Sequence, residues 1–476
     1  MTTAPPGMAS TPSQAASTPS QTASTPQGSL HRTMTLRDLM MNGLVFIGPA
    51  AAVGVFGPLD ARSHGATAMV YIMATVVMGF TAISYAQMSR AVPRAGSVFS
   101  YASAGVGPGT GFIAGWMVLL DYMLIPSVAY LFTGLAMHSF VPSVPTWLWT
   151  VAAVLITTAL NLTGIKHIAR AAMVVAIAEI VVLMAVLVGI MAALGTAGAQ
   201  RPVLSPLTAV GGFSMSAVIG AVSIAVLAYL GFDAIATFAE ENAGEARLVG
   251  TATVACLVIA GVLFFAQSYL VSLLAATSPA EFAAHPELQG TAYYDVIREF
   301  VAPWLATALG VAKALGASFS GMIALAAGGR VALTMSREGR LPRGLSGISG
   351  RTGIPTIATV SVTAVTLGVA VWAARAPDGL DLLVSIVSIG ALCAFVLLHV
   401  SVVGFFMVRL RSQRYVVHLL LPILGIATLI PVLVLANHRA QVIGAIWLVV
   451  GLITAAVQSH RSSAASAAPV TESALR

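Results

Sequence analysis

The stretch AYLGFDAIATFAEE (228–241) places a glycine and an acid inside a run that is otherwise apolar. A charged side chain at the centre of a membrane helix costs about 2.5–3.5 kcal/mol. Glycine readily adopts backbone torsions that end a helix. The residues from Tyr229 to Phe232, with Gly231 between them, are therefore the weakest point of this helix. We expect the helix to be interrupted there, beside Asp233.

A second interruption is expected near the N-terminus, in GLVFIGPAAAVGVFGPL (43–59). Proline removes a backbone donor and clashes with the preceding turn, so Gly48 and Pro49 predict an unwound segment that extends to Gly54. Either stretch taken singly is compatible with an ordinary membrane helix, because Gly and Pro are commoner there than in soluble helices. The two interruptions, however, lie five apolar segments apart, and an odd offset inverts one segment relative to the other. This arrangement is typical of inverted-repeat transporters with a site near the bilayer midplane.

The composition is that of a membrane protein. Of 476 residues, 58% are hydrophobic and 8% are charged, whereas soluble domains carry about 25% charged residues. The net charge is +7, but the arginines form no basic patch with interleaved aromatics, so nucleic-acid binding is not indicated. Cys256 and Cys393 both lie in apolar runs and suggest neither a disulfide framework nor a metal site. Motifs of ATP-driven pumps, zinc proteases and serine hydrolases are absent, so we expect no catalytic residues, cofactor or metal.

Twelve apolar segments are long enough to cross the bilayer, which takes about 20 helical residues. They are residues 39–58, 66–89, 109–137, 146–163, 170–194, 213–239, 248–276, 300–329, 354–374, 380–408, 415–436 and 440–458. Each must be helical, because the bilayer holds no water to satisfy backbone groups. We therefore expect an all-α membrane protein with twelve transmembrane helices in one transporter domain, 34–458. Within it, 34–195 and 213–410 are expected to form a five-plus-five inverted repeat with helices 1 and 6 broken, followed by two extra helices in 415–458.

The positions of the basic residues predict the orientation. Alternate connections, counted from the N-terminal segment, hold 17 of the 23 Lys and Arg residues, and such loops face the cytoplasm. Both termini of this multi-pass protein of the cell membrane are thus expected in the cytoplasm. Residues 1–33, rich in Ser, Thr, Pro and Gln, predict a disordered tail, and 459–476 a flexible one. The acidic connection 277–299 is expected to face outward.

Several longer motifs point to one family. They are PRAGSVFSYASAGVGPGTGFIAGW (93–116), NLTGIKHIAR (161–170), YLGFDAIATFAEE (229–241) and GRVALTMSREGRLPR (329–343). Together they resemble signatures of the amino acid-polyamine-organocation (APC) family of secondary transporters. Within that family, FTAISYAQMSRAVPRAGSVFSYA (80–102) and LLDYMLIP (119–126) are most similar to putrescine importers and amine permeases. Span 1 departs from the Gly-Ser-Gly-Ile-Phe pattern of many amino acid permeases, since it reads AAAVGVF.

The resemblance implies a LeuT-like fold whose substrate lies between the broken helices and the third span. Exposed helix ends attract carboxylates at N-termini and cations at C-termini, so a zwitterion or an organic amine suits such a site. The expected substrate-binding residues lie at the two breaks and on the third span. They are Gly48, Pro49, Ala50, Val53, Gly54, Val118, Leu119, Asp121, Tyr122, Met123, Tyr229, Gly231, Phe232 and Asp233.

Four charged residues lie well inside apolar runs, namely Asp121, Glu179, Asp233 and Lys313. Each must face a wet cavity, pair or stay neutral. For Asp233, a cation or proton site competes with a neutral acid that caps loose backbone. For Asp121, contact with a substrate ammonium competes with a hydrogen bond between helices. By contrast, Gln267 and His399 are expected to be packed and hydrogen-bonded rather than ligands.

Proton coupling is expected to involve Asp233, Glu179, Lys313 and Ser320. The resemblance implies a lysine in the fifth span that takes the place of a sodium ion, but Glu179, 13 residues after Lys166, reverses that sign. Lys313 then supplies the cation, and Ser320, seven residues further on, lies on the same helical face. A Glu179–Lys313 pair that changes protonation as a gate moves competes with a static ion pair.

The sequence thus favours a secondary active transporter, and not an enzyme. It is expected to import an organic amine, putrescine- or polyamine-like, or an amino acid, with proton coupling and alternating access. An exchanger and a non-transporting sensor of the same fold are the alternatives, while the inverted pattern disfavours a channel. The expected partners are the substrate, protons and the lipid bilayer, with no nucleic acid and no obligate protein partner.

Overall fold

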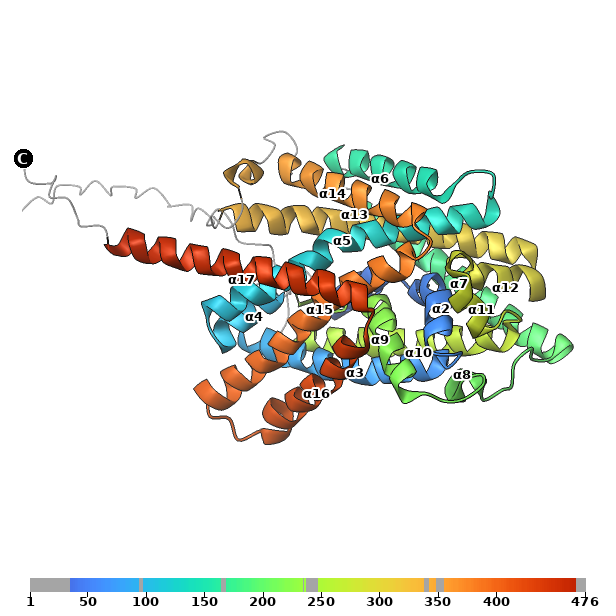
Figure 1. Cartoon of the computed structure of the whole chain (residues 1–476), viewed down its shortest axis with the longest axis horizontal. Coiled ribbons are helices and arrows are strands. Elements are labelled where there is room, and N and C mark those ends of the chain that lie inside the picture. Colours follow the sequence, from blue (N-terminus) through green and yellow to red (C-terminus); the bar gives the residue numbers. More distant parts are fainter. Residues whose placement is uncertain are drawn as a thin grey trace, which may run out of the picture.

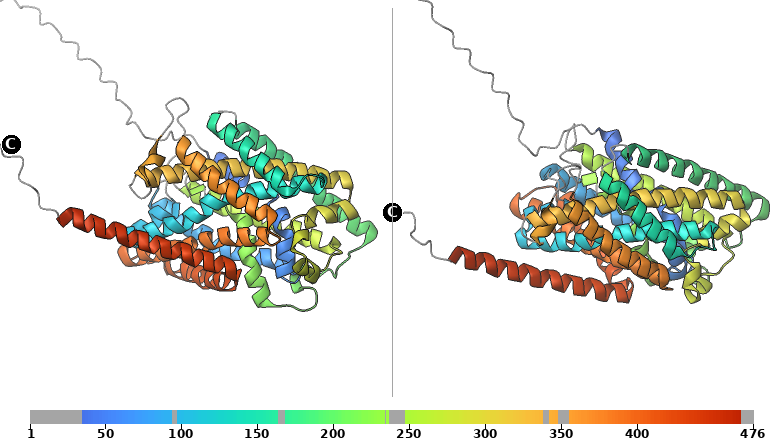
Figure 2. Two further views of the ribbon diagram at one scale, coloured as in Figure 1. Left: turned by 45° about the horizontal axis from the view of Figure 1, so that its top comes forward. Right: turned by 90° about the horizontal axis from the view of Figure 1, so that it is seen from above.

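The structure, a computed structural model, describes residues 35–93, 97–163, 168–233, 235–236, 247–337, 342–347 and 355–467. All regular elements in these ranges are helices. Most of the long helices lie along the longest axis of the molecule, packed side by side (Figure 1). The two turned views in Figure 2 show the same bundle, with α17 along its outer edge.

The helices follow one another with short connections. In the first half they are α1 (Leu36–Ile47), α2 (Ala51–Arg62), α3 (Thr67–Ala91), α4 (Ser97–Gly105), α5 (Pro108–Phe140), α6 (Thr146–Thr163) and α7 (Ile168–Ala197). Next come α8 (Ser205–Thr208), α9 (Met215–Tyr229), α10 (Arg247–Leu274), α11 (Pro279–Ala284), η2 (Pro286–Leu288), α12 (Ala292–Phe300) and α13 (Pro303–Arg337). The last are η3 (Arg343–Ser346), α14 (Thr356–Arg375), α15 (Gly379–Val402), η4 (Val403–Arg409), η5 (Val416–Leu420), α16 (Leu421–Leu435) and α17 (His438–Ala467).

Nine of the described helices are long and apolar enough to cross a membrane, counting α15 with η4 and η5 with α16 as one each. The pair α1 and α2 passes the same test as one bent unit, with 44° between the two helices. α6 and α9 are shorter apolar helices. Each predicted segment therefore coincides with an apolar helix, as expected of an all-α membrane protein. The crossing of the bilayer by all twelve, and their inverted repeat, stay predictions.

The helix bounds differ from the predicted ones in several places. The eighth segment is divided, because the amphipathic α12 ends at Phe300 and α13 begins at Pro303. The tenth segment ends in a π-helix, η4, instead of a continuous α-helix. α17 continues to Ala467, beyond residue 458 where the sequence predicts a tail. The acidic connection 277–299 contains two short helices, α11 and α12, that pack against α2.

The core lies around α5, which packs against α4, α6, α13, α14, α15 and α17. A reciprocal pair of tryptophans fixes α17 to it. The Trp116 indole donates to the Trp447 carbonyl (2.8 Å), and the Trp447 indole donates to the Trp116 carbonyl (2.9 Å). Their rings stack at 4.7 Å between centroids. His399 on α15 is buried and hydrogen-bonds Ser84 on α3 (2.9 Å), so its expected structural role is confirmed.

Candidate functional site

The first break lies between α1 and α2. α1 ends at Ile47, Gly48 has a φ of +77°, and α2 begins at Ala51, after Pro49 and Ala50. The predicted extension of the break to Gly54 is wrong, because Val53 and Gly54 are helical. The helix resumes after Pro49, since a proline before the first turn removes no hydrogen bond that the helix needs. A Cβ at Gly54 would lie 2.8 Å from the Phe132 ring, so this glycine serves close packing of α2 on α5 instead.

The second break follows α9, which ends at Tyr229. Leu230 leaves the helical region and Gly231 has a φ of +117°. A Cβ at Gly231 would lie 2.4 Å from Cδ1 of Phe46, so the two breaks are in direct contact. The Gly231 amide donates to Oδ1 of Asp233 (3.1 Å). Asp233 therefore does cap loose backbone, which was one of its two expected roles.

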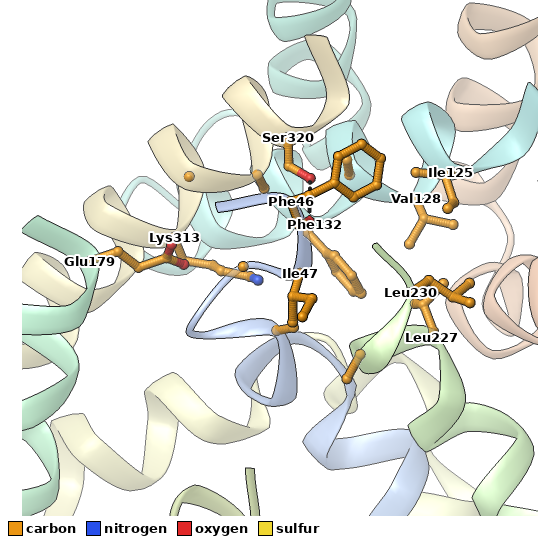
Figure 3. A pocket seen from close by; sticks show the side chains of 16 residues that line it. Phe46, Ile47, Ile125, Val128, Phe132, Glu179, Leu227, Leu230, Lys313 and Ser320 are labelled. Atoms are coloured by element: carbon orange, nitrogen blue, oxygen red, sulfur yellow. Dashed lines mark hydrogen bonds between the residues drawn. The ribbon is translucent and has the colours of Figure 1, made fainter. Parts of the chain in front are cut away.

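A small cavity of about 60 Å³ lies at the place where these broken ends meet (Figure 3). It is lined from α1 and α2, α5, α7, α9 and α13. The lining residues are Phe46, Ile47, Gly48, Ala51, Ile125, Val128, Ala129, Phe132, Glu179, Leu227, Ala228, Leu230, Lys313, Gly316, Ala317 and Ser320. The C-terminal end of α1 and the N-terminal end of α2 both contribute, so the cavity meets helix ends of opposite partial charge.

Four of the predicted site residues line this cavity: Gly48, Glu179, Lys313 and Ser320. The others do not, namely Pro49, Ala50, Val53, Gly54, Val118, Leu119, Asp121, Tyr122, Met123, Tyr229, Gly231, Phe232 and Asp233. On α5 the lining begins at Ile125 and ends at Phe132, further along the helix than the predicted stretch. The level at which α5 passes the breaks depends on helix packing, which sequence periodicity does not give.

Glu179 and Lys313 are both buried and lie at the same side of the cavity. The Lys313 ammonium points into the cavity, 5.4 Å from the centroid of the Phe132 ring. The Glu179 carboxylate lies beside the stem of the lysine (Figure 3), and no N–O distance within 4.0 Å joins the two groups in the described residues. Oε1 of Glu179 has no hydrogen-bond partner. The two charges therefore interact electrostatically without the direct contact of a static ion pair.

Two polar side chains hold the first break from neighbouring helices. Gln267 on α10 donates to the Pro49 carbonyl (3.0 Å), and Ser320 on α13 donates to the Phe46 carbonyl (3.4 Å). Both carbonyls belong to the end of α1 or the break, where helical partners are lost. Gln267 was expected to be a packed structural residue, and its hydrogen bond agrees with that. Its contact with the break was not foreseen, although a buried amide in an apolar helix signals such a partner.

A second buried charged cluster lies outside the cavity lining and is formed by Asp121 and Asp233. They are 3% and 5% exposed, and their carboxyl groups interact electrostatically. Oδ1 of Asp121 has no hydrogen-bond partner. Tyr85 and Tyr122 lie within electrostatic range of Asp233, and Tyr85 packs edge-on against Phe232. Acids surrounded by aromatic rings suit a cationic ammonium group.

Sequence reasoning missed a buried ion pair at the far end of α2. The Arg201 guanidinium binds the Asp60 carboxylate with two bonds, of 2.8 and 2.9 Å, and also donates to the Thr277 carbonyl. The Asp60 side chain is 0% exposed and that of Arg201 6%. A second, half-buried pair joins Arg62 to Asp381 on α15 (3.5 Å). These contacts fix α2, one half of the broken span, to three other parts of the chain.

Some predictions lie outside the described residues. They concern Lys166, the disordered segment 1–33 and the stretch 237–246 that follows the second break. Within the described residues, no group of three or more His, Cys, Asp or Glu side chains is placed to hold a metal ion.

The apolar helices and the cavity between broken ends define a multi-pass membrane protein with a buried site for a small solute. Residues 39–459 match the family model described as amino acid permease, so the chain belongs to the amino acid permease (APC) family. The chain is 28% identical over 440 residues to the low-affinity putrescine importer PlaP of Escherichia coli (strain K12), covering 89% of this chain and 93% of that protein. It is 26% identical over 342 residues to the branched-chain amino acid permease BcaP of Lactococcus lactis subsp. cremoris (66% and 70% covered). Over 219 residues it is 25% identical to the gamma-aminobutyric acid permease of Escherichia coli (45% and 46% covered).

Proposed function

We propose that this protein is a secondary active transporter that imports an organic amine or an amino acid across the cell membrane by alternating access. Family membership supports transport of such solutes, and relatives are named for putrescine, branched-chain amino acids and gamma-aminobutyrate. The observation that carries the proposal is the cavity between the broken ends of α1, α2 and α9, with two buried charges in its wall. Twelve spans in a five-plus-five inverted repeat, with both termini in the cytoplasm, belong to the same proposal.

The cavity must widen before it can hold a solute. Its volume is about 60 Å³, whereas sites for small molecules usually measure about 300–1,000 Å³. The two glycines at the breaks, Gly48 and Gly231, are suited to act as hinges, because a few residues at element ends absorb the torsion changes of such motions. Movement of α2 or α9 about these points would open the cavity to one side of the membrane at a time.

The charges in the site favour a solute that carries an ammonium group. The Asp121–Asp233 cluster, with its tyrosines, suits that group. The Lys313 ammonium and the N-terminal end of α2 suit a carboxylate, as in an amino acid. For a diamine such as putrescine, the Lys313 charge in the cavity is unfavourable unless Glu179 neutralises it. The proposed substrate class therefore includes both, with the amino acid as the better match to the cavity itself.

Proton coupling follows from the separation of Glu179 and Lys313. When Glu179 is protonated, the cavity keeps the net positive charge of Lys313 and attracts a carboxylate. When Glu179 loses its proton, the two charges balance and that attraction falls. Binding of an amino acid would therefore favour uptake of one proton, which is the linkage that a symporter needs. Ser320 and Asp233, at the two broken helices, are proposed to transmit this change to the gate.

Uptake into proteoliposomes tests the proposal. We expect purified protein to accumulate labelled putrescine, gamma-aminobutyrate or leucine when the lumen is more alkaline than the medium, and to do so weakly without the gradient. The Glu179→Gln variant should bind substrate but lose the dependence on the gradient, whereas Glu281→Gln, an exposed acid, should behave as wild type. Flux that needs substrate on the opposite side instead of a pH gradient would indicate an exchanger. Binding without any flux would indicate a sensor and refute transport.

A further inference from the structure

A groove of about 510 Å³ lies at one end of the bundle, away from the central cavity. It is bounded by the end of α4, by α15 with its π-helical extension η4, and by α16. Its walls are apolar, with Val400, Val408 and Ile423 exposed by 37%, 72% and 48%. One charged residue, Arg409, joins the lining. In a membrane protein, an apolar trough that ends at a guanidinium has the polarity of a lipid chain and its headgroup.

The turn beside the groove concentrates positive charge without a partner. Arg409, Arg411 and Arg414 lie within six residues, and the sequence contains no Asp or Glu from residue 382 to 471. None of the three arginines takes part in an ion pair with any residue that the structure describes. The end of α4 that lines the groove carries no acid either. An anion from outside the chain is therefore the natural partner of this cluster.

The turn is held rigidly enough to be a site. The Leu410 and Ser412 amides donate to the Phe405 and Phe406 carbonyls (3.1 and 2.8 Å). Phe406 stacks on His418 at 4.0 Å, and the His418 ring is hydrogen-bonded to Ser412 (2.8 Å). These contacts keep two π-helical segments, η4 and η5, together on either side of the turn.

The turn also stores local strain. Arg411 has a φ of +50°, which is unfavourable for a residue with a Cβ. π-Helices and strained torsions are both rare and cluster at functional positions.

We propose that this groove binds one anionic glycerophospholipid, with an acyl chain along the valine and isoleucine wall and the phosphate at Arg409 and Arg411. The predicted orientation places the turn on the cytoplasmic side, where basic residues meet anionic headgroups. A phosphate accepts two parallel hydrogen bonds from one guanidinium, so arginine is the suitable residue. A lipid held here would connect α4, α15 and α16, and so would stabilise the packing of α16 on the bundle.

Native mass spectrometry of the full-length protein, titrated with dioleoyl phosphatidylglycerol or dioleoyl phosphatidylcholine, tests this assignment. We expect one tightly bound phosphatidylglycerol and much weaker phosphatidylcholine. The double substitution Arg409→Gln and Arg411→Gln should weaken phosphatidylglycerol binding by about 30-fold, at roughly a tenfold change or slightly less per arginine. Val408→Gln should weaken it through the acyl chain, and Arg247→Gln, an equal change of charge on α10, should have no effect.

Three results would overturn the assignment. The first is equal binding of the two lipids, and the second is an equal loss in the Arg247→Gln variant, which would indicate unspecific attraction to surface charge. The third is full displacement of the lipid by inorganic phosphate at the same concentration, which would remove any role for the apolar wall. Melting temperatures of all variants, measured in one detergent, establish that each is folded. A dimer of the wild-type protein that Val408→Gln dissociates would assign the groove to a second copy instead and would equally contradict a lipid site.

Discussion

Substitution of Asp60 by asparagine should destabilise the protein more than any change to an exposed ion pair. The Asp60–Arg201 pair is bidentate and almost fully buried. Removing one partner leaves the other as an uncompensated buried charge, which costs about 3–5 kcal/mol. The entropy of unfolding for a chain of this length is about 1 kcal/mol/K, so the melting temperature should fall by about 3–5 °C. The exposed pair Arg439–Asp378 is the matched control, because such pairs contribute about 0.2–1 kcal/mol.

The assay is thermal unfolding of detergent-purified protein, followed by a thiol-independent method such as tryptophan fluorescence. We expect Asp60→Asn to melt well below wild type and Asp378→Asn to melt within about 1 °C of it. The double substitution Asp60→Leu and Arg201→Met should recover much of the loss, since apolar residues of similar volume often replace a buried pair without cost. Equal shifts for Asp60→Asn and Asp378→Asn, or no recovery in the double variant, would refute the reasoning.

Three further predictions concern the breaks, the acids and the packing of α17. Gly231→Ala should reduce uptake at least tenfold, because the new Cβ would collide with Phe46 in a torsion that alanine disfavours, while Gly79→Ala on α3 meets open space and should leave uptake intact. Asp121→Asn should weaken binding of putrescine more than that of leucine in a calorimetric titration, and equal losses would exclude a role in amine recognition. Trp447→Phe removes one indole hydrogen bond to α5 and should cost about 1 kcal/mol in thermal unfolding; unchanged stability would show that stacking alone holds α17.

The helices and both breaks could be predicted from the sequence because they depend on local properties. Apolar runs of sufficient length predict membrane helices, and the torsions that Gly48 and Gly231 adopt are accessible mainly to glycine. The shared face of Lys313 and Ser320 followed from their helical spacing, and both line the cavity. The extent of the first break was overestimated, because Gly54 was taken as a sign of unwinding when it makes room for Phe132.

The residues that the sequence could not place depend on contacts between distant helices. Asp60 and Arg201 are separated by 141 positions, and neither stands out in a segment that ends near the membrane surface. The part of α5 that lines the cavity, Ile125 to Phe132, follows from how deeply this helix crosses the breaks. Asp121 is charged and conspicuous in the sequence, but it lies with Asp233 in a separate cluster outside the cavity lining.

The central claim is that solute binds where the two interrupted helices meet. Its most direct test is the rate at which a methanethiosulfonate reagent modifies an Ala51→Cys variant in a background with Cys256 and Cys393 replaced by serine. Saturating substrate, either putrescine or gamma-aminobutyrate as uptake selects, should slow this modification at least tenfold and leave an Ala284→Cys control on the exposed face of α11 unchanged. If substrate slows neither reaction, or if the Ala51→Cys variant still transports at full rate after complete modification, the cavity at the broken helices is not where solute binds.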